Sequence, residues 1–363
     1  MKLIPCLIAL LFIHSIVAEV TITPISSKNL SPNQNIVENQ LPLANQSHEV
    51  VKVEDIVLVS QMDISVLVKV QVDKYGVAQQ VAGFQIANPT SSLHGLALSA
   101  KNPGMVWITL ETDNKLVLID PVASSVTDAP KVIKEIDVPK PGNGPHYIGE
   151  YETDLWVSLK ESDDVLRINY ENTTDYNIYK GVPNPIFVAQ HPINKMIYTS
   201  EDMSSKLMKI NPATGETTQI DVDPSAGSTP VGMISGPNGI WFTLLGNATA
   251  GTGTFGFIDQ DDKIVYHKLK SDLGKDAALL HLAFDVAYET NYKMYLLSSS
   301  ITNPKALDMV IKVTFNEQWT TIKDEEVIVI PTQQCKAHRL LSTQFNVFAT
   351  ELTASKLLTL FSP

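Results

Sequence analysis

The sequence predicts an all-β protein, a seven-bladed β-propeller with a disordered N-terminal extension, from three observations. From residue 50 onward the apolar runs are short, rich in β-branched and aromatic residues, and separated by turn residues, a pattern typical of strands rather than helices. These runs recur in units of roughly 40 to 55 residues, the period of propeller blades. Six units place an aromatic residue at the same point of their second predicted strand: Trp107, Trp156, Tyr198, Trp241, Tyr295 and Phe348.

Each unit consists of a short strand, a turn, the aromatic-led strand, a second turn and a third strand, and a fourth strand often follows. Six of the units begin at Leu93, Pro145, Pro185, Pro230, Leu280 and Ala337. A weaker copy over residues 50 to 90 precedes them and brings the predicted blades to seven. Four short antiparallel strands form one blade, and because a single blade cannot bury both of its faces, the aromatic residues are expected between neighbouring blades. A large β-sandwich is the competing architecture, but it leaves the constant position of the aromatic residue unexplained.

The first 49 residues do not share this pattern. One lysine precedes an apolar run from Leu3 to Val17, and Ala18 follows it, which is the layout of a secretory signal peptide. The run is shorter than the roughly 20 apolar residues that span a membrane; an uncleaved anchor is the alternative. We expect a signal peptide over residues 1–18, a disordered linker over residues 19–49, where Ser, Asn, Gln and Pro are frequent, and a propeller domain over residues 50–363. The product is expected to be secreted and extracellular.

The net charge of the chain limits the classes of partner that it can bind. The formal net charge is −12, and the sequence has no basic run, which disfavours nucleic acid and anionic membranes as partners. We expect instead a monomer without a membrane span that binds a small-molecule ligand or substrate. Asn-x-Ser/Thr sequons predict a glycoprotein modified at Asn45, Asn172 and Asn247; the sequon at Asn29 is a poor acceptor because Pro32 follows it.

Cysteine usage predicts no disulfide framework. Cys6 lies within the predicted signal peptide, so the mature chain keeps Cys335 alone. Cys335 stands three residues before His338, but a structural zinc site needs four ligands. We expect a buried, unpaired and inert thiol.

Histidines recur where the first strand of a predicted blade begins. In a propeller this strand lines the central channel, and its opening position holds His94, His146, Ile186, Val231, His281 and His338. A single histidine there often only bonds the neighbouring blade, whereas several that face one axis indicate a ligand or proton-transfer site. His94 and His146 are therefore channel-lining candidates.

The blade sequences resemble those of a known family. "GPHYI", "LWVSL" and "VLRI" in one unit, and "PVGMISGPNGIWFTLL" in another, resemble the streptogramin B lyases, also called virginiamycin B lyases, which are seven-bladed propellers. The resemblance covers roughly residues 50 to 360. That family carries a catalytic histidine at the start of each of the last two blades and a metal-binding glutamate on the final aromatic-led strand. The resemblance thus implies that His281 and His338 are catalytic and that Glu351 binds metal.

The resemblance also implies a reaction, the elimination of an ester or lactone C–O bond. His338 would remove a proton next to a carbonyl, Glu351 would hold Mg²⁺, and His281 would orient or protonate the leaving oxygen. A neutral histidine suits proton abstraction near pH 7, and magnesium needs only one or two carboxylates. Because Glu351 lies three residues after Phe348, it is expected to project from the end of its strand into the channel mouth, within about 10 Å of both histidines. The alternative is a secreted propeller that binds a small molecule or protein without chemistry, since a fold alone does not choose.

Overall fold

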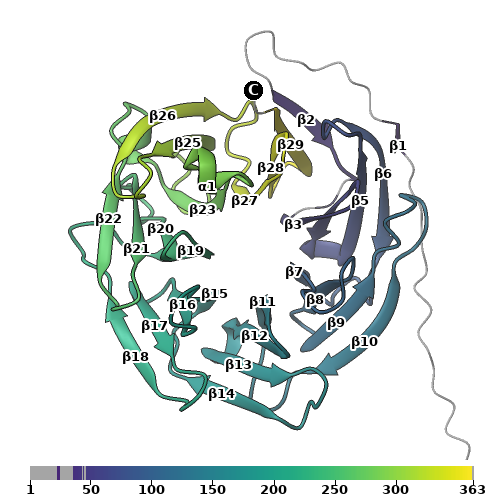
Figure 1. Ribbon diagram of the computed structural model, residues 1–363. Helices are drawn as coiled ribbons and strands as arrows, with labels where there is room; N and C mark the ends of the chain where they lie inside the picture. The colour runs from purple at the N-terminus through teal and green to yellow at the C-terminus, as the bar shows by residue number, and fades with distance from the viewer. Residues whose placement is uncertain (1–22, 25–35, 43, 45, 362–363) are drawn as a thin grey trace, which may run out of the picture.

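The computed structural model describes residues 23–24, 36–42, 44 and 46–361, which form one five-stranded and six four-stranded β-sheets. The sheets are arranged in a ring, each with one strand nearest the centre and the others following outward (Figure 1). This architecture confirms the predicted seven-bladed β-propeller. The predicted signal peptide and most of the predicted linker lie outside the described residues. Within the described ranges no helix has the length and apolar character needed to cross a membrane.

Five blades are meanders of four consecutive antiparallel strands. The second contains β7 (Leu93–Leu98), β8 (Val106–Leu110), β9 (Lys115–Asp120) and β10 (Lys131–Asp137), and the third β11 (Pro145–Tyr151), β12 (Asp154–Leu159), β13 (Asp164–Asn169) and β14 (Tyr176–Lys180). The fourth contains β15 (Pro185–Gln190), β16 (Ile197–Glu201), β17 (Lys206–Ile210) and β18 (Thr217–Asp221), and the fifth β19 (Pro230–Gly236), β20 (Gly239–Leu244), β21 (Thr254–Ile258) and β22 (Ile264–Lys268). The sixth contains β23 (Leu279–Phe284), β24 (Lys293–Ser298), β25 (Met309–Phe315) and β26 (Ile322–Val329). Short helices occupy turns: α1 (Tyr288–Asn291) and the 3₁₀ helices η1 (Met62–Ile64), η2 (Lys160–Ser162) and η3 (Gly274–Asp276).

The first and last blades are joined through the N-terminal side of the chain. The first blade contains β3 (Ser47–Val53), β4 (Ile56–Gln61), β5 (Val66–Val72) and β6 (Ala78–Gln85), and β1 (Thr23–Pro24) pairs with β6. The last blade contains β27 (Ala337–Ser342), β28 (Asn346–Glu351) and β29 (Lys356–Phe361), and β2 (Ile36–Gln40) pairs with β29 as its outermost strand. Figure 1 shows β2 running alongside the last blade. The ring is thus closed by backbone hydrogen bonds between distant parts of the sequence.

The closing strand corrects the predicted boundary of the linker at residue 49. The structure has β2 and the start of β3 inside the expected linker. Nδ2 of Asn39 donates to Leu357 O at 3.3 Å and to Thr359 Oγ1 at 3.2 Å, and Glu38 accepts hydrogen bonds from Lys356. Because its polar side chains find partners on the last blade, this segment forms a strand although few of its residues are apolar.

The aromatic residue of each second strand packs against the next blade, as predicted. All six are at most 2% exposed. Trp107 shares a buried cluster with Ile148 of the third blade, and Phe348 shares one with Val57 of the first. In the first blade Leu58 takes the place of the aromatic residue and packs with the second blade.

A hydroxyl side chain two residues further along the second strand ties neighbouring inner strands together. These hydroxyls belong to Ser60, Thr109, Ser158, Ser200, Thr243 and Thr350. Each accepts a hydrogen bond from its own inner strand and donates one to a carbonyl of the next blade. Thr350, for example, accepts from the N–H of Arg339 at 3.0 Å and donates to His48 O at 2.8 Å. Only the sixth blade lacks the hydroxyl, because Leu297 stands at that position.

Cys335 is buried, and the part of the chain that the structure describes contains no second cysteine. Burial raises the pKa of its thiol, and the nearby carboxyl groups of Asp308 and Glu351 raise it further. The prediction of a buried thiol is confirmed.

Candidate functional site

The second residue of every inner strand lines one cavity at the mouth of the channel. The inner strands share a one-residue register shift just after their first residue, which gives each second residue the same position. We call these residues the mouth ring: His48, His94, His146, Ile186, Val231, Leu280 and His338. Four of the seven are histidines, and His94, His146 and His338 of the predicted histidines lie at this mouth.

The third residue of each inner strand forms a second layer, the inner ring. Its members are Glu49, Gly95, Tyr147, Phe187, Gly232, His281 and Arg339. His281 was expected at the opening position, but the register places Leu280 there and His281 one residue further. In the inner ring Nδ1 of His281 accepts the N–H of Leu340 at 3.1 Å. His281 thus links the sixth and last blades where Leu297 provides no hydroxyl.

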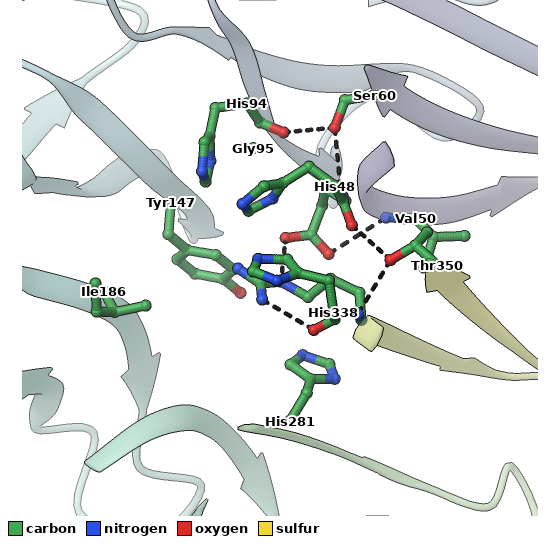
Figure 2. Close-up of polar contacts among 12 residues, drawn as sticks. His48, Val50, Ser60, His94, Gly95, Tyr147, Ile186, His281, His338 and Thr350 are labelled. Atoms are coloured by element: carbon green, nitrogen blue, oxygen red, sulfur yellow. Dashed lines mark hydrogen bonds and ion pairs between the residues drawn. The ribbon is translucent and has the colours of Figure 1, made fainter. Parts of the chain in front are cut away.

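Side chains of the inner ring meet across the axis beneath the mouth. Arg339 of the last blade forms an ion pair with Glu49 at 3.0 Å, and its guanidinium lies 4.7 Å from the ring centre of Phe187 in the fourth blade. The ring of Phe187 in turn lies 4.8 Å from Tyr147 and 5.4 Å from His281. Figure 2 shows Tyr147 and His281 reaching toward this centre from different sides. These contacts give the mouth cavity a floor that contains one buried charge pair.

The four imidazoles of the mouth ring form a row across neighbouring blades. Centroid distances are 3.9 Å from His338 to His48, 3.7 Å from His48 to His94 and 3.7 Å from His94 to His146. Figure 2 shows the first three following one another. We call these four residues the histidine row. Sequence reasoning missed His48 because the propeller was expected to begin at residue 50; the match of "SH" at residues 47–48 to "LH" and "PH" in later blades was the available signal.

Burial keeps the histidine row neutral. Desolvation lowers the pKa of each imidazole well below its ordinary value, and nearby positive groups such as Arg339 lower it further. Nδ1 of His94 lies 2.9 Å from the carbonyl oxygen of His146, and because a carbonyl only accepts, this nitrogen carries the hydrogen. Nδ1 of His48, His146 and His338 has no hydrogen-bond partner within the described residues. The row therefore offers neutral nitrogens that can accept a proton or bind a metal.

One carboxylate adjoins the row. Glu111 is the first residue after β8, and its Oε2 lies 3.7 Å from Nδ1 of His146. Both atoms are buried without a hydrogen-bond partner. Ligand atoms of His94, Glu111 and His146 all lie within 4.8 Å of one another, and this is the single such group found among the described residues.

The mouth cavity has a polar side and a mainly apolar side. Its volume is about 390 Å³. The mainly polar side comes from the last blade and the first three: Gln46, His48, His94, Glu111, His146, Lys160, Glu161, His338 and Arg339, with Met62 and Leu352 as its apolar members. The opposite side comes largely from the fourth to sixth blades: Ile186, Val231, Leu245, Leu280 and Ile301, with Asp202 and Thr302 as its polar members.

Glu351 lies outside this cavity. The ladder of β28 continues through its last residue, where Glu351 pairs with Ala337 and Lys356. Side chains alternate along a strand, so Glu351 faces the sixth blade, as Ala349 does, and Leu352 lines the cavity instead. The expectation that Glu351 projects into the mouth is not met, because the strand does not end early enough to release it.

The surroundings of Glu351 do not fit a magnesium ligand at the mouth. The side chain is fully buried, and no donor bonds either oxygen. Burial, followed by the negative charge of Glu38, raises the pKa of Glu351 to about 8. Burial acts on Glu38 too, but hydrogen bonds from Lys356 and Thr332 hold its pKa below the ordinary value. Glu351 is therefore protonated at neutral pH, and a protonated carboxyl is a poor ligand for a hard cation.

Comparisons with known proteins support the fold. No protein-family model matches the sequence, and no curated protein matches it. Virginiamycin B lyase from Staphylococcus aureus is similar over 90% of this chain and 99% of that chain, with 16% identity and a TM-score of 0.68; a catalytically inactive histidine-to-alanine variant of it with quinupristin is similar too. A streptogramin B lyase structure is 18% identical over 90% and 96% of the two chains, with a TM-score of 0.67. Hydrazine synthase from Kuenenia stuttgartiensis is 13% identical over 89% and 97%, with a TM-score of 0.66. These likenesses show a shared propeller fold.

Proposed function

We propose that the protein binds a small organic molecule in the mouth cavity, with a polar end toward the histidine row and an apolar part toward the fourth to sixth blades. The observation that carries this proposal is the division of one concave cavity into these two sides. A volume of about 390 Å³ lies in the usual range of small-molecule sites, roughly 300–1,000 Å³, and such sites combine apolar walls with a few polar groups.

Binding is tested with quinupristin as the first probe, since a variant of a similarly folded lyase is described with it. Val231→Phe narrows the apolar side of the cavity and should weaken binding at least about tenfold, the effect of losing roughly 1.4 kcal/mol of contact. The matched control is Val265→Phe, because Val265 is exposed on β22, away from the mouth. Calorimetric titration measures both. Equal affinity of the two variants for any small molecule that binds would show that the mouth is not its site.

A second candidate function is elimination of an ester or lactone C–O bond. His338 lines the cavity as a neutral imidazole with an unpartnered Nδ1, the state required of a general base. In this reaction His338 takes the proton from the carbon next to a carbonyl, a C=C bond forms, and the C–O bond breaks with departure of the ester oxygen on its carboxylate. Magnesium at Glu351 has no part in this candidate.

Mass spectrometry separates the two functions. Elimination within a lactone leaves the mass of the compound unchanged, whereas hydrolysis adds one water. If the protein is a lyase, His338→Ala should abolish turnover of quinupristin or a related ester while retaining the fold by circular dichroism. If wild-type protein binds the compound and returns it intact, the protein is a binding propeller.

We also propose that the protein is secreted and N-glycosylated, from the predicted signal peptide and its sequons. Asn172 and Asn247 are exposed in turns, where each accepts a hydrogen bond from its sequon threonine, Thr174 or Thr249. Asn45 lies outside the described residues. Expression through a eukaryotic secretory pathway should give a medium-borne product whose gel mobility shifts on glycosidase treatment. Asn172→Gln and Asn247→Gln should each remove one glycan; an unchanged mobility would contradict the assignment.

A further inference from the structure

We propose that His94, Glu111 and His146 bind one divalent transition-metal ion at the edge of the mouth cavity. The assignment concerns this chain's own side chains and does not depend on which organic molecule the cavity takes. It differs from the site that the family resemblance implies, which would involve Glu351 and the last blade.

The geometry of the three residues is close to that of a metal site. Their ligand atoms lie within 4.8 Å of one another, and Glu111 Oε2 is 3.7 Å from His146 Nδ1. Ligands at roughly 2.0–2.2 Å from a tetrahedral ion are separated by about 3.3–3.6 Å. A small inward movement of side chains therefore completes the site.

Two of the candidate ligand atoms have no hydrogen-bond partner among the described residues. They are Oε2 of Glu111 and Nδ1 of His146, and both are buried. Their separation of 3.7 Å is too long for a direct hydrogen bond. Buried polar atoms in proteins nearly always have a hydrogen-bond partner, and a bound ion is one of the few explanations for exceptions. A cation between these atoms would satisfy both.

The supporting contacts resemble the outer shell of metal sites. A ligating histidine usually donates its second ring N–H to a carbonyl or carboxylate, which fixes the tautomer. Nδ1 of His94 donates in this way to the carbonyl of His146, leaving the lone pair on Nε2. Thr109 Oγ1 donates to the same carbonyl at 3.2 Å. His94 and His146 stand on adjacent inner strands, and such rigid elements hold ligand geometry well.

The donor set selects the class of metal. Two imidazoles and one carboxylate suit zinc and its neighbours in the first transition row, whereas magnesium and calcium prefer oxygen ligands alone. Three protein ligands also leave a coordination position open. Because all three residues line the mouth cavity, that position faces the space in which a small molecule would bind.

The positive charge of Lys160 should repel a bound cation, which gives a second way to test the proposal. Lys160 also lines the cavity. Burial lowers the pKa of His146 most, and the positive charge of Lys160 lowers it further. The same repulsion should weaken the binding of a cation. Removing the charge with Lys160→Met should therefore tighten metal binding by a few-fold, whereas removing a ligand should weaken it.

The experiment titrates Zn²⁺, and Co²⁺ as a coloured substitute, into the full secreted chain without a polyhistidine tag. Wild-type protein should bind one ion per chain, and bound Co²⁺ should give visible absorption bands of a low-coordinate site. Glu111→Gln, His94→Ala and His146→Ala should each weaken Zn²⁺ binding by more than about 100-fold, since loss of a second-shell group alone costs about 10- to 100-fold. Glu111→Gln is nearly isosteric and lies in a turn, so it reports on charge without altering the inner strands.

His338→Ala is the matched control, because His338 occupies the same ring position and is equally buried but lies outside the group of three. It should change Zn²⁺ affinity by no more than about threefold, within the usual spread of indirect effects. Absence of stoichiometric binding by wild-type protein, or equal affinity in Glu111→Gln, would overturn the proposal. If His338→Ala loses as much Zn²⁺ affinity as His94→Ala, the ion binds elsewhere in the histidine row and the proposed ligand set is wrong. Failure of metal binding leaves the proposed binding of a small molecule standing, because that titration contains no metal.

Discussion

Glu201 of the fourth blade and Glu351 of the last blade occupy the same place in their sheets, yet only one has hydrogen-bond donors. Both are the final residue of a second strand, and both are fully buried. The carboxylate of Glu201 accepts a hydrogen bond from Gln219 at 2.8 Å and another from Ser204. Neither oxygen of Glu351 accepts one from the described residues, and the side chain faces Glu38.

The difference comes from the outermost strand of each blade. Gln219 pairs with Met208, two residues beyond the lysine opposite Glu201, and Glu38 pairs with Leu358, two residues beyond the lysine opposite Glu351. The fourth blade thus supplies an amide where the last blade supplies a second carboxyl. A repeated position does not fix a repeated role, because the neighbour across the sheet decides whether a buried glutamate finds a hydrogen-bond donor.

The largest expected effect is the contribution of Glu351 to the pH dependence of stability. Its folded pKa of about 8 exceeds the ordinary 4.5, so between these values the folded state holds a proton that the unfolded chain has lost. This contribution to stability is fully present below pH 4.5 and disappears as the pH rises through 8, with a change of the order of a few kcal/mol. Glu351→Gln keeps a donor toward Glu38 at every pH and should remove the dependence.

Denaturant unfolding at pH 5 and at pH 8.5 measures this effect. The neutral histidine row acts in the opposite sense, since its lowered pKa values favour the folded state as pH rises through 6.5. Because the histidine row is the same in both proteins, its contribution cancels when the free energies of unfolding of wild-type protein and Glu351→Gln are subtracted. Parallel profiles for the two proteins would show that Glu351 is charged in the folded state.

The next effect is the loss of a satisfied carboxylate. Glu201→Leu leaves Gln219 and Ser204 without their acceptor inside the blade, which should lower the free energy of unfolding by about 2–3 kcal/mol. Glu351→Leu removes a carboxyl that has no donor, so at pH 8 it should cost little or stabilise the protein. Chemical unfolding at pH 8 measures both variants. Equal losses in the free energy of unfolding would show that the two glutamates do not differ in their hydrogen-bond donors.

The smallest effect tests whether Glu38 is the cause. Glu38→Gln gives the last blade the amide that the fourth blade has, at a cost of about 1 kcal/mol from weakened bonding to Lys356. The pH midpoint assigned to Glu351 should move toward acid, because the neighbouring negative charge is gone and an N–H donor is present. A midpoint that stays near 8 would mean that burial alone raises the pKa of Glu351.

Much of the fold follows from repetition in the sequence. Strand length, turn spacing and the aromatic residue of each second strand are local properties, and they recur often enough to predict seven blades. The closing strand β2 could not be predicted this way. Its pairing with β29 depends on partners such as Leu357 and Thr359, and a polar five-residue segment carries no local signal for them.

Only part of the candidate site could be predicted from the sequence. His94, His146 and His338 were expected at the channel because each follows the first residue of its strand, whereas His48 and Glu111 were not predicted. His281 and Glu351 were placed by counting along the chain, which ignores the register shift at the start of β23 and the strict alternation of β28. A shift of one residue moves a side chain to the other face of its strand. Leu280 and Leu352 therefore line the cavity in place of His281 and Glu351.

The pairing of β2 with β29 also orders events during synthesis. Asn39 bonds a carbonyl 318 residues further along the chain, so this contact forms only after nearly every other strand has left the ribosome. Until then β2 lacks its partner strand, and an unpaired strand edge invites pairing with another chain. Contacts between such distant residues are slow to form. A nascent chain can therefore stack its first six blades early, but the ring stays open until β29 emerges and pairs with β2.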